Sequence, residues 1–190
     1  MSRNTDFNKE EVVGKAMEVF WNKGYENTSM RDLVEATGLL KGSLYNTFES
    51  KENLFLLCLE KYGAHSRSFY FSEGDDPKAY LKKFFKRLVD EGVDKDFTKG
   101  CLIMNSCLEF MGKDNALGKK SSALFSAVEL NLGNVASAIA IEDSSINVEK
   151  TKTNLISAAF SIREISKFRK DKKFLKQIAN NALNDLKLNI

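Results

Sequence analysis

Polar side chains that suit contact with a nucleic acid are concentrated in residues 28–51, which read TSMRDLVEATGLLKGSLYNTFESK. Hydroxyl, amide and cationic groups near helix N-termini reach phosphates and base edges, and a glycine lets the backbone approach a groove closely. Lys41 and Asn46 are candidates for base edges, and Tyr45 is a candidate for a phosphate. The alternative is that these side chains form only the solvated face of a helical head. The candidate DNA-contacting residues are Thr28, Ser29, Arg31, Lys41, Gly42, Ser43, Tyr45, Asn46, Thr47 and Lys51.

Helix start and stop signals divide the first 60 residues into four helical segments. Asn8 and Ser29 each precede an acidic residue at the spacing of a capping box, and Ser50 is a third candidate N-cap. Gly24 and Gly38 follow the first two segments and can end them. Two short helices joined by a glycine-containing turn and braced by a longer helix form a helix-turn-helix, whose second helix enters the major groove of DNA.

Net charge does not by itself predict a DNA-binding head. The whole chain has a formal charge of +3, yet residues 1–60 contain seven Lys and Arg against ten Asp and Glu. If this acidic part binds an anion, the local placement of its cations must be responsible.

The remaining composition indicates an all-α protein in the cytoplasm. The 190 residues include one proline, Pro77, and show no alternating strand pattern and no apolar run long enough to span a bilayer. The N-terminus lacks an apolar signal-peptide core. The three cysteines are an odd number and form no paired spacing, and His65 is the single histidine. We therefore predict no disulfide framework, no metal site and no cofactor.

A family resemblance adds to this interpretation. The segment FWNKGYENTSMRDLVEATGLLKGSLYNTFESKENLF closely resembles the DNA-binding head of the TetR family of transcriptional regulators, and the resemblance covers roughly residues 8–60. It implies about nine helices, with a DNA-binding domain at residues 1–50 and a helical effector-binding and dimerisation domain at residues 51–190. By the same resemblance, Thr28, Lys41, Tyr45 and Lys51 fall where family members touch phosphates, and Gly42, Ser43 and Asn46 fall on the recognition helix.

One residue departs from the family pattern. Leu40 stands where family members often have Ser or Thr, so the recognition helix loses its usual N-cap. Without a replacement, this loss should cost about 0.5–2 kcal/mol.

An effector pocket is the next implication of the resemblance. Apolar walls with a few polar groups are typical of ligand cavities, and a packed core without a cavity is the alternative. The segment KGCLIMNSCLEF resembles one branch of the family in which some members sense electrophiles through a cysteine. This resemblance makes Cys101 a candidate sensor of electrophiles or oxidants, and Lys99 nearby can lower a thiol pKa. The alternative for this cysteine is a small buried hydrophobe. The predicted pocket residues are Phe84, Leu88, Cys101, Met104, Asn105, Cys107, Leu108, Phe125, Val128 and Glu129.

The last two helices carry apolar stripes at helical spacing, which the resemblance assigns to a four-helix dimer interface. The alternative is a core within one chain. The basic run from Arg163 to Lys176 suggests either a second nucleic-acid patch or a solvated loop, and we favour the solvated loop. The predicted dimer residues are Ile156, Phe160, Ile165, Phe168, Leu175, Ile178, Ala182 and Leu186.

These features together predict a homodimeric transcriptional regulator, a repressor that releases a two-fold symmetric DNA operator when a small molecule binds. An enzyme is not expected, because the sequence has no nucleophile elbow, P-loop or dinucleotide fingerprint. A helical adaptor that binds only proteins is the other alternative, and the motif at residues 28–51 speaks against it.

Overall fold

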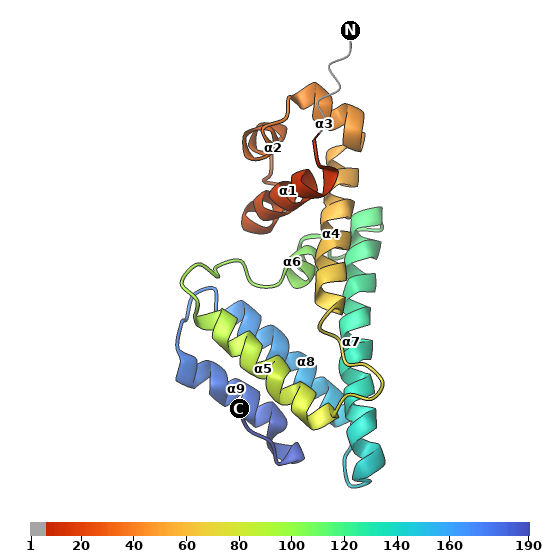
Figure 1. Cartoon of the computed structure of the whole chain (residues 1–190), viewed down its shortest axis with the longest axis vertical. Coiled ribbons are helices and arrows are strands. Elements are labelled where there is room, and N and C mark those ends of the chain that lie inside the picture. The colour runs from red at the N-terminus through yellow and green to blue at the C-terminus, as the bar shows by residue number, and fades with distance from the viewer. Residues whose placement is uncertain (1–6) are drawn as a thin grey trace.

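The computed structural model describes residues 7–190, and within them the chain forms nine α-helices and a short 3-10 turn (Figure 1). No strand occurs in this part of the chain, so the prediction of an all-α fold is confirmed. The helices are α1 (Lys9–Lys23), α2 (Met30–Thr37), α3 (Lys41–Phe48), α4 (Lys51–Arg67), α5 (Pro77–Val93), α6 (Leu102–Glu109), α7 (Ala116–Glu142), α8 (Val148–Ile165) and α9 (Lys172–Leu183), followed by the 3-10 turn Asn184–Leu186.

Most helices begin where a polar side chain caps them. Asn8, Ser50 and Asp76 each accept hydrogen bonds from the first-turn N–H groups of the helices that follow them. At α1 the cap forms without a reciprocal capping box, because the Glu11 carboxylate pairs with Lys15 at 2.7 Å. The start signals in the sequence therefore predicted these helix boundaries correctly.

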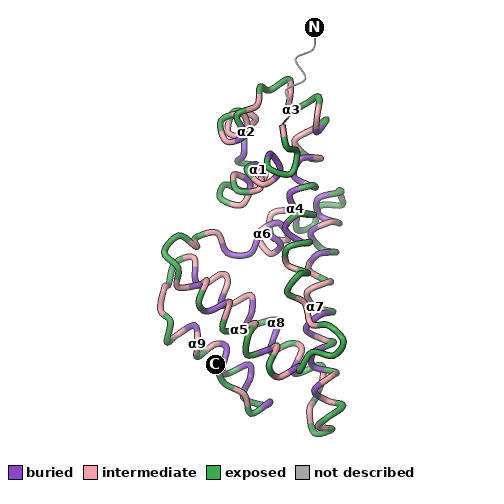
Figure 2. The backbone as a smooth tube through the Cα atoms, in the orientation of Figure 1, coloured by how far each residue is buried: buried purple, intermediate pink, exposed green. Residues whose placement is uncertain are grey.

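Helices α1 to α3 form a head at one end of the elongated molecule, braced by the first half of α4 (Figure 1). Phe20, Leu33, Leu44 and Phe55 are each at most 1% exposed and join the head elements in one apolar core. This first core also contains residues of α6 and of the first half of α7. Burial is concentrated on the inner faces of the helices, and the outer side of the α2–α3 region is exposed (Figure 2).

A second apolar core lies among α5, the second half of α7, α8 and α9. In Figure 1 these helices form the half of the molecule opposite the head, with α5, α8 and α9 side by side. Helices α4 and α7 connect the two halves and pack closely where Gly63 meets Leu124. A Cβ atom added at Gly63 would lie 2.5 Å from that leucine side chain, so any larger residue at Gly63 would force Leu124 to shift.

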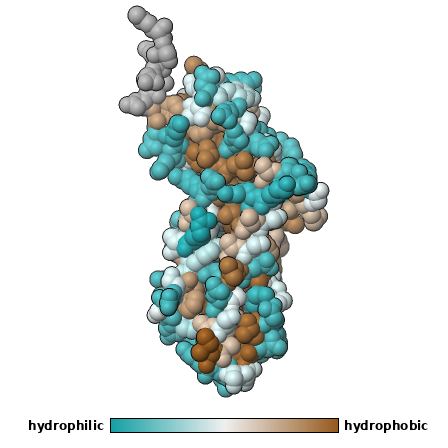
Figure 3. Space-filling model, turned by 90° about the vertical axis from the view of Figure 1, so that its right-hand side faces the viewer, coloured by the Kyte–Doolittle hydropathy of each residue, from teal (hydrophilic) through white to brown (hydrophobic). Residues whose placement is uncertain are grey.

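The 27-residue helix α7 corrects one expectation about apolar runs. An 18-residue window of α7 has a mean hydropathy of 1.5 and passes as a bilayer-spanning segment by length and composition. Only 33% of that window is buried, yet α7 packs along α4, α6 and α8. Seen from the α7 side, apolar side chains lie in separate patches among hydrophilic ones (Figure 3). We therefore interpret α7 as a core helix that joins the two halves of the fold.

Candidate nucleic-acid interface and ligand cavity

Helix α3 presents one polar face to solvent and one apolar face to the head. Leu44 and Phe48 are buried and hold the helix in place. Lys41, Gly42 and Asn46 are exposed. Tyr45 is 41% exposed, while Ser43 and Thr47 are half-buried. The predicted recognition residues of α3 thus share one side of a helix at the surface of the molecule.

The start of α3 lacks a side-chain cap, as its sequence predicts. Leu40 takes the N-cap position with φ −64° and ψ 149°, makes no capping hydrogen bond and is 76% exposed. Gly38 before it ends α2 in the left-handed conformation at φ 73°. No atom lies within 4 Å of a Cβ built on Gly42, so the α3 backbone is uncovered at that point.

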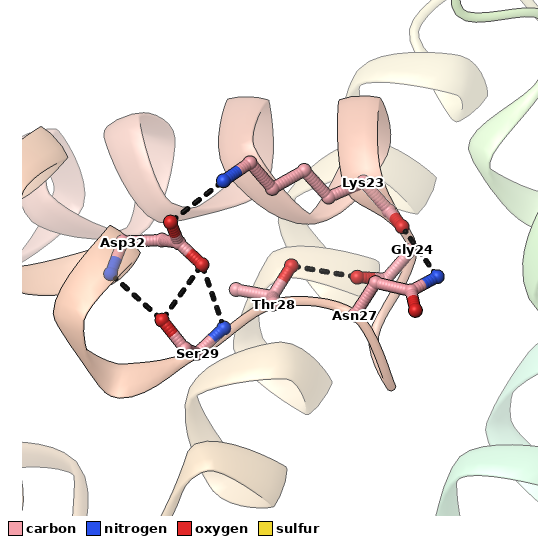
Figure 4. Close-up of polar contacts among 6 residues, drawn as sticks. All are labelled: Lys23, Gly24, Asn27, Thr28, Ser29 and Asp32. Carbon is pink, nitrogen blue, oxygen red and sulfur yellow. Dashed lines mark hydrogen bonds and ion pairs between the residues drawn. The ribbon is translucent and has the colours of Figure 1, made fainter.

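The start of α2 is held by a closed set of polar contacts (Figure 4). The Ser29 hydroxyl accepts from the Asp32 N–H at 3.2 Å, and an Asp32 carboxylate oxygen accepts from the Ser29 N–H at 2.8 Å. Lys23 pairs with Asp32 at 2.6 Å. The hydrogen bond from Lys23 and those from Ser29 hold the pKa of Asp32 well below its usual range. This capping box fixes the helix that lies beside α3.

Thr28 needs a correction as a DNA-contacting residue. Its side chain is 1% exposed, and its hydroxyl donates to the Gly24 carbonyl at 2.6 Å (Figure 4). The backbone N–H of Thr28 donates to Tyr25. Thr28 therefore shapes the turn before α2 and offers neither group to a phosphate.

Ion pairs explain how a head with more acidic than basic residues can still present free cations. Five of its acidic residues are taken up in ion pairs, namely Glu11, Glu18, Glu26, Asp32 and Glu60. Among the described residues, Arg31, Lys41 and Lys51 make no ion pair. Lys51 lies 4.3 Å from the Tyr25 ring centroid, and Lys41 lies 5.9 Å from that of Tyr45. Besides Lys9 at the start of α1, the cations of residues 7–60 left for a polyanion are those at the start of α2, α3 and α4.

One carboxylate of α6 ties the head to the rest of the molecule. Glu109, the last residue of α6, accepts the N–H of Tyr25 at 3.0 Å and that of Glu26 at 2.7 Å. A carboxylate at a helix C-terminus opposes the helix dipole, and these two donors offset that cost. The salt bridges Lys99–Glu18 and Lys113–Glu26 add to the same junction.

A cavity of about 80 Å³ lies where the two apolar cores meet. Tyr62 and Ile103 from the first core and Leu88 from the second line it. The cavity lies behind a wider cleft of about 780 Å³ beside α5, and the two share Phe69, Tyr70, Phe84 and Arg87 as lining residues.

Four predicted pocket residues line this cavity, namely Phe84, Leu88, Cys101 and Val128. The other six do not line it, because the faces of α6 and α7 that carry them do not border the cavity. Leu108 is 59% exposed, and Asn105 bonds to Lys99 and Lys167. Phe125 stacks on Phe160, while Met104 and Cys107 pack against the first core and Glu129 is half-buried on α7. Phe160, predicted for the dimer interface, lines the cavity instead.

Cys101 is buried at the start of α6. It is 9% exposed, and its sulfur accepts the Tyr62 hydroxyl at 3.8 Å. Lys99 pairs with Glu18 and lies 5.1 Å from the Trp21 ring centroid. These contacts fit the alternative of a small buried hydrophobe, and sensing through Cys101 stays a prediction.

The apolar stripe of α9 also needs a correction. Leu175, Ala182 and Leu186 belong to the second core, so they pack within the chain and cannot form the surface of a dimer. Ile156, Ile165 and Ile178 are half-buried against that core. Of the predicted interface residues, Phe168 is the large apolar side chain left open, at 80% exposure.

Comparisons with known proteins agree with this architecture. Residues 12–58 match the sequence model of the family described as "Bacterial regulatory proteins, tetR family". The HTH-type transcriptional repressor ComR of Escherichia coli K12 is 36% identical over 105 residues, which are 53% of this chain and 50% of ComR. The uncharacterized HTH-type transcriptional regulator YezE of Bacillus subtilis 168 is 32% identical over 123 residues, which are 63% of each chain. The matched chain thus spans between half and 63% of these relatives' length.

The whole fold is also found in solved structures. A cysteine variant of the TetR family transcriptional regulator CifR, solved with 26-bp operator DNA, aligns with a TM-score of 0.82 at 25% identity over 96% of this chain and 98% of that chain. A further cysteine variant of CifR aligns with a TM-score of 0.83 at 23% identity. The head and the nine-helix architecture define a helix-turn-helix fold with a helical C-terminal domain. Residues 12–58 match the TetR family, and the whole chain has the fold of TetR-family regulators.

The cavity residues that the sequence analysis missed include two arginines. Arg87 stands between Phe84 and Leu88 on the apolar face of α5, and a cation on such a face is a signal for a polar site. Arg163 was included in the basic run interpreted as a solvated loop. Its side chain is 15% exposed and pairs with Glu91 at 2.6 Å, so that interpretation is wrong for Arg163.

Proposed function

We propose that the protein is a homodimeric, sequence-specific DNA-binding transcriptional repressor of the bacterial cytoplasm, released from its operator by a small molecule. The observation that carries this proposal is the exposed polar face of α3. It combines an uncovered backbone at Gly42 with three cations at helix starts that have no acidic partner among residues 7–190. A helix of this kind suits the major groove, and its flanking cations suit phosphates.

Relatives support the same function. ComR is named a transcriptional repressor, and CifR has been solved with double-strand operator DNA. Ser29 is set aside with Thr28, because its hydroxyl and its N–H both donate to Asp32. The residues we propose for DNA contact are therefore Arg31, Lys41, Gly42, Ser43, Tyr45, Asn46, Thr47 and Lys51.

A dimer is part of the proposal because a single head reads only one half-site. Two heads related by a two-fold axis would meet half-sites about 34–36 Å apart, one turn of DNA. The outward face of α8 with the Phe168 turn is the surface we propose for this contact.

Release by an effector requires a link between the cavity and the head, and α6 provides one. Its N-cap residue Cys101 and its residue Ile103 line the cavity. Its last residue Glu109 holds the backbone of the turn after α1. A ligand that shifts α6 would therefore change the position of the head. In a dimer, the ligand would favour the spacing between the two heads at which it binds more tightly.

The test is binding to DNA fragments that cover the region upstream of the protein's own gene, measured by fluorescence anisotropy at several salt concentrations. We expect sequence preference, and affinity that falls as salt rises because bound cations displace counterions from DNA. Lys41→Gln should weaken binding and reduce the salt slope by about one per protomer. Lys82→Gln on the exposed side of α5 is the control, and it should leave both unchanged. Binding without sequence preference or without salt dependence would reject the proposal.

A further inference from the structure

The cavity between the two cores has an unusual balance of charge. Its lining includes two arginines, Arg87 and Arg163, and no acidic residue. Five aromatic side chains and several aliphatic ones form the rest of the wall. Cations in an apolar wall are costly unless an anion compensates them.

The two arginines differ in how far their charge is satisfied. Glu91, which lies in the outer cleft, pairs with Arg163 at 2.6 Å, while its other oxygen lies 3.6 Å from the Arg87 Nε. That Nε is buried and has no hydrogen-bond partner in the described chain. The Arg87 guanidinium also stacks on Phe69, with its central carbon 3.8 Å from the ring centroid. The Glu91 carboxylate thus lies between two guanidinium groups, and its shorter ion pair is with Arg163.

Other acidic residues near Arg87 are already engaged. In the outer cleft, Asp76 caps α5 and Asp75 accepts the N–H of Ser72. Asp90 pairs with Lys172 at 2.8 Å. Burial lowers the pKa of Arg87, but a guanidinium stays charged at neutral pH. Arg87 therefore remains a partly buried cation without a full counter-charge.

Two other polar side chains of the cavity are already hydrogen-bonded within the chain. Asn131 uses its oxygen for the Phe71 N–H and its nitrogen for the Tyr80 hydroxyl, both at 2.9 Å. The Tyr62 hydroxyl donates to Cys101. The polar groups left for a ligand are the Arg87 guanidinium and the hydroxyls of Ser66 and Tyr70. Phe69 and Phe84 form the aromatic walls beside them.

We propose that the effector is an anionic aromatic or aliphatic acid, whose carboxylate or similar group binds Arg87 and whose apolar body lies against Phe84, Leu88 and Phe160. The body extends into the adjoining cleft of about 780 Å³, because the cavity of about 80 Å³ is smaller than an ordinary ligand pocket. This inference rests on the proposed function in that it names the chemical class of the effector. A planar guanidinium suits a carboxylate because two parallel N–H donors match its two oxygens. The apolar wall supplies the affinity for the body, and Arg87 supplies the selection for an anion.

The test uses three probes of similar shape and different charge: 3-phenylpropanoate, 3-phenylpropanamide and 3-phenylpropylamine. Binding to the full-length protein without DNA is measured by isothermal titration calorimetry. The carboxylate should bind about ten- to a hundredfold more tightly than the amide, because it gains charged hydrogen bonds. The amine should bind most weakly. Equal binding of the carboxylate and the amide, or binding of none of the three, would overturn the inference.

Substitutions test whether Arg87 is responsible for the preference for the carboxylate over the amide. Arg87→Gln should bring the carboxylate-to-amide ratio close to one, whereas Arg87→Lys should keep part of it. The control Lys82→Gln removes a cation from the same helix outside the cavity and should keep the wild-type ratio. Circular dichroism checks that each variant folds, and Arg87→Lys keeps the test valid if Arg87→Gln does not. A wild-type ratio in a folded Arg87→Gln would overturn the inference.

A separate readout distinguishes this inference from the proposed function. The DNA-binding assay without any probe tests the function, and the calorimetry without DNA tests the ligand class. If DNA binding fails while the carboxylate still selects Arg87, the proposed function falls and the ligand class remains. If DNA binding succeeds while the three probes bind alike, only the ligand class is overturned.

Discussion

Leu40 is a residue where the sequence works against local stability. It occupies the N-cap of α3 with cap-like backbone angles, yet its side chain accepts no hydrogen bond and is 76% exposed. Leu40→Ser should stabilise the protein by about 0.5–2 kcal/mol, because the hydroxyl can accept a first-turn N–H. Urea unfolding measures this gain. Leu40→Ala is the matched control, since it removes the same apolar surface without adding a cap, and equal stability of the two variants would contradict the prediction.

Substitution of Gly42 should affect the stability of the fold and the affinity for DNA in opposite directions. Nothing lies within 4 Å of a Cβ built there, and alanine favours a helix over glycine. Gly42→Ala should therefore keep or raise stability by up to about 0.5–1 kcal/mol. If the α3 backbone closely approaches the groove, the same change should lower affinity for the operator severalfold. Anisotropy and urea unfolding on the same preparation check both, and unchanged affinity would mean that the groove lies farther from Gly42.

Asp32 gives a pH-dependent prediction with a fixed sign. The Lys23 hydrogen bond, followed by those from Ser29, holds its pKa below the usual range, so the folded state favours the carboxylate. The stabilisation is present above the unfolded pKa, about 3.9, and is lost as pH falls through the lower folded pKa. Lys23→Gln should raise the pKa of Asp32 toward its ordinary value in an NMR titration.

The control for this titration is Asp171, whose pKa is also lowered. The largest cause is the hydrogen bond that its carboxylate accepts from the Phe174 N–H. Asp171 caps α9 far from Lys23, so its pKa should not move in Lys23→Gln. A parallel rise at both carboxyls would indicate a general loss of structure instead of a local effect.

At the scale of elements, α6 is placed to join the cavity to the head. Glu109→Ala removes the acceptor for two backbone N–H groups, of which the Tyr25 N–H is partly buried. We expect a loss of about 1–3 kcal/mol in unfolding free energy. Hydrogen exchange should speed up at Tyr25 and Glu26 before it does in α8. Glu109→Gln retains one acceptor oxygen and should give a smaller effect. Unchanged exchange at both amides in Glu109→Ala would contradict the role of this link.

Elements were predicted well where local chemistry sets them. Asn8, Ser29, Ser50 and Asp76 cap the helices that their types and positions predict, since capping depends only on neighbouring residues. The polar face of α3 was likewise visible in residues 41–48.

Which face of a helix meets which neighbour was harder to predict. Met104, Asn105 and Cys107 share α6 with Ile103, but only Ile103 among them lines the cavity. Leu175 and Phe168 look alike as apolar residues of the closing helices, yet one is fully buried and the other is 80% exposed. Helical periodicity shows that a face is apolar and does not show what covers it.

At the scale of the molecule, the cavity lies at the junction of the two cores and not inside either. Val128 of α7 packs against both cores and also lines the cavity. A ligand there contacts α5 of the second half and α6 of the first. A ligand that fits better at one relative position of these halves would stabilise that position, and the proposed release would then need no change inside the head.

The last prediction concerns the dimer, and Phe168 tests it with little risk to the fold. The residue is 80% exposed in the turn after α8, so Phe168→Glu should not change the unfolding free energy of the single chain. A large aromatic side chain at the centre of an interface contributes about 2 kcal/mol or more. We therefore expect a dimer dissociation constant weakened at least about thirtyfold, measured by sedimentation equilibrium. Operator affinity should fall in parallel, because one head contacts only one half-site.

Met111→Glu is the matched control, since Met111 is 77% exposed and lies in the turn between α6 and α7. If both variants remain dimers like the wild type, the interface does not include Phe168; if both dissociate alike, added charge is the cause.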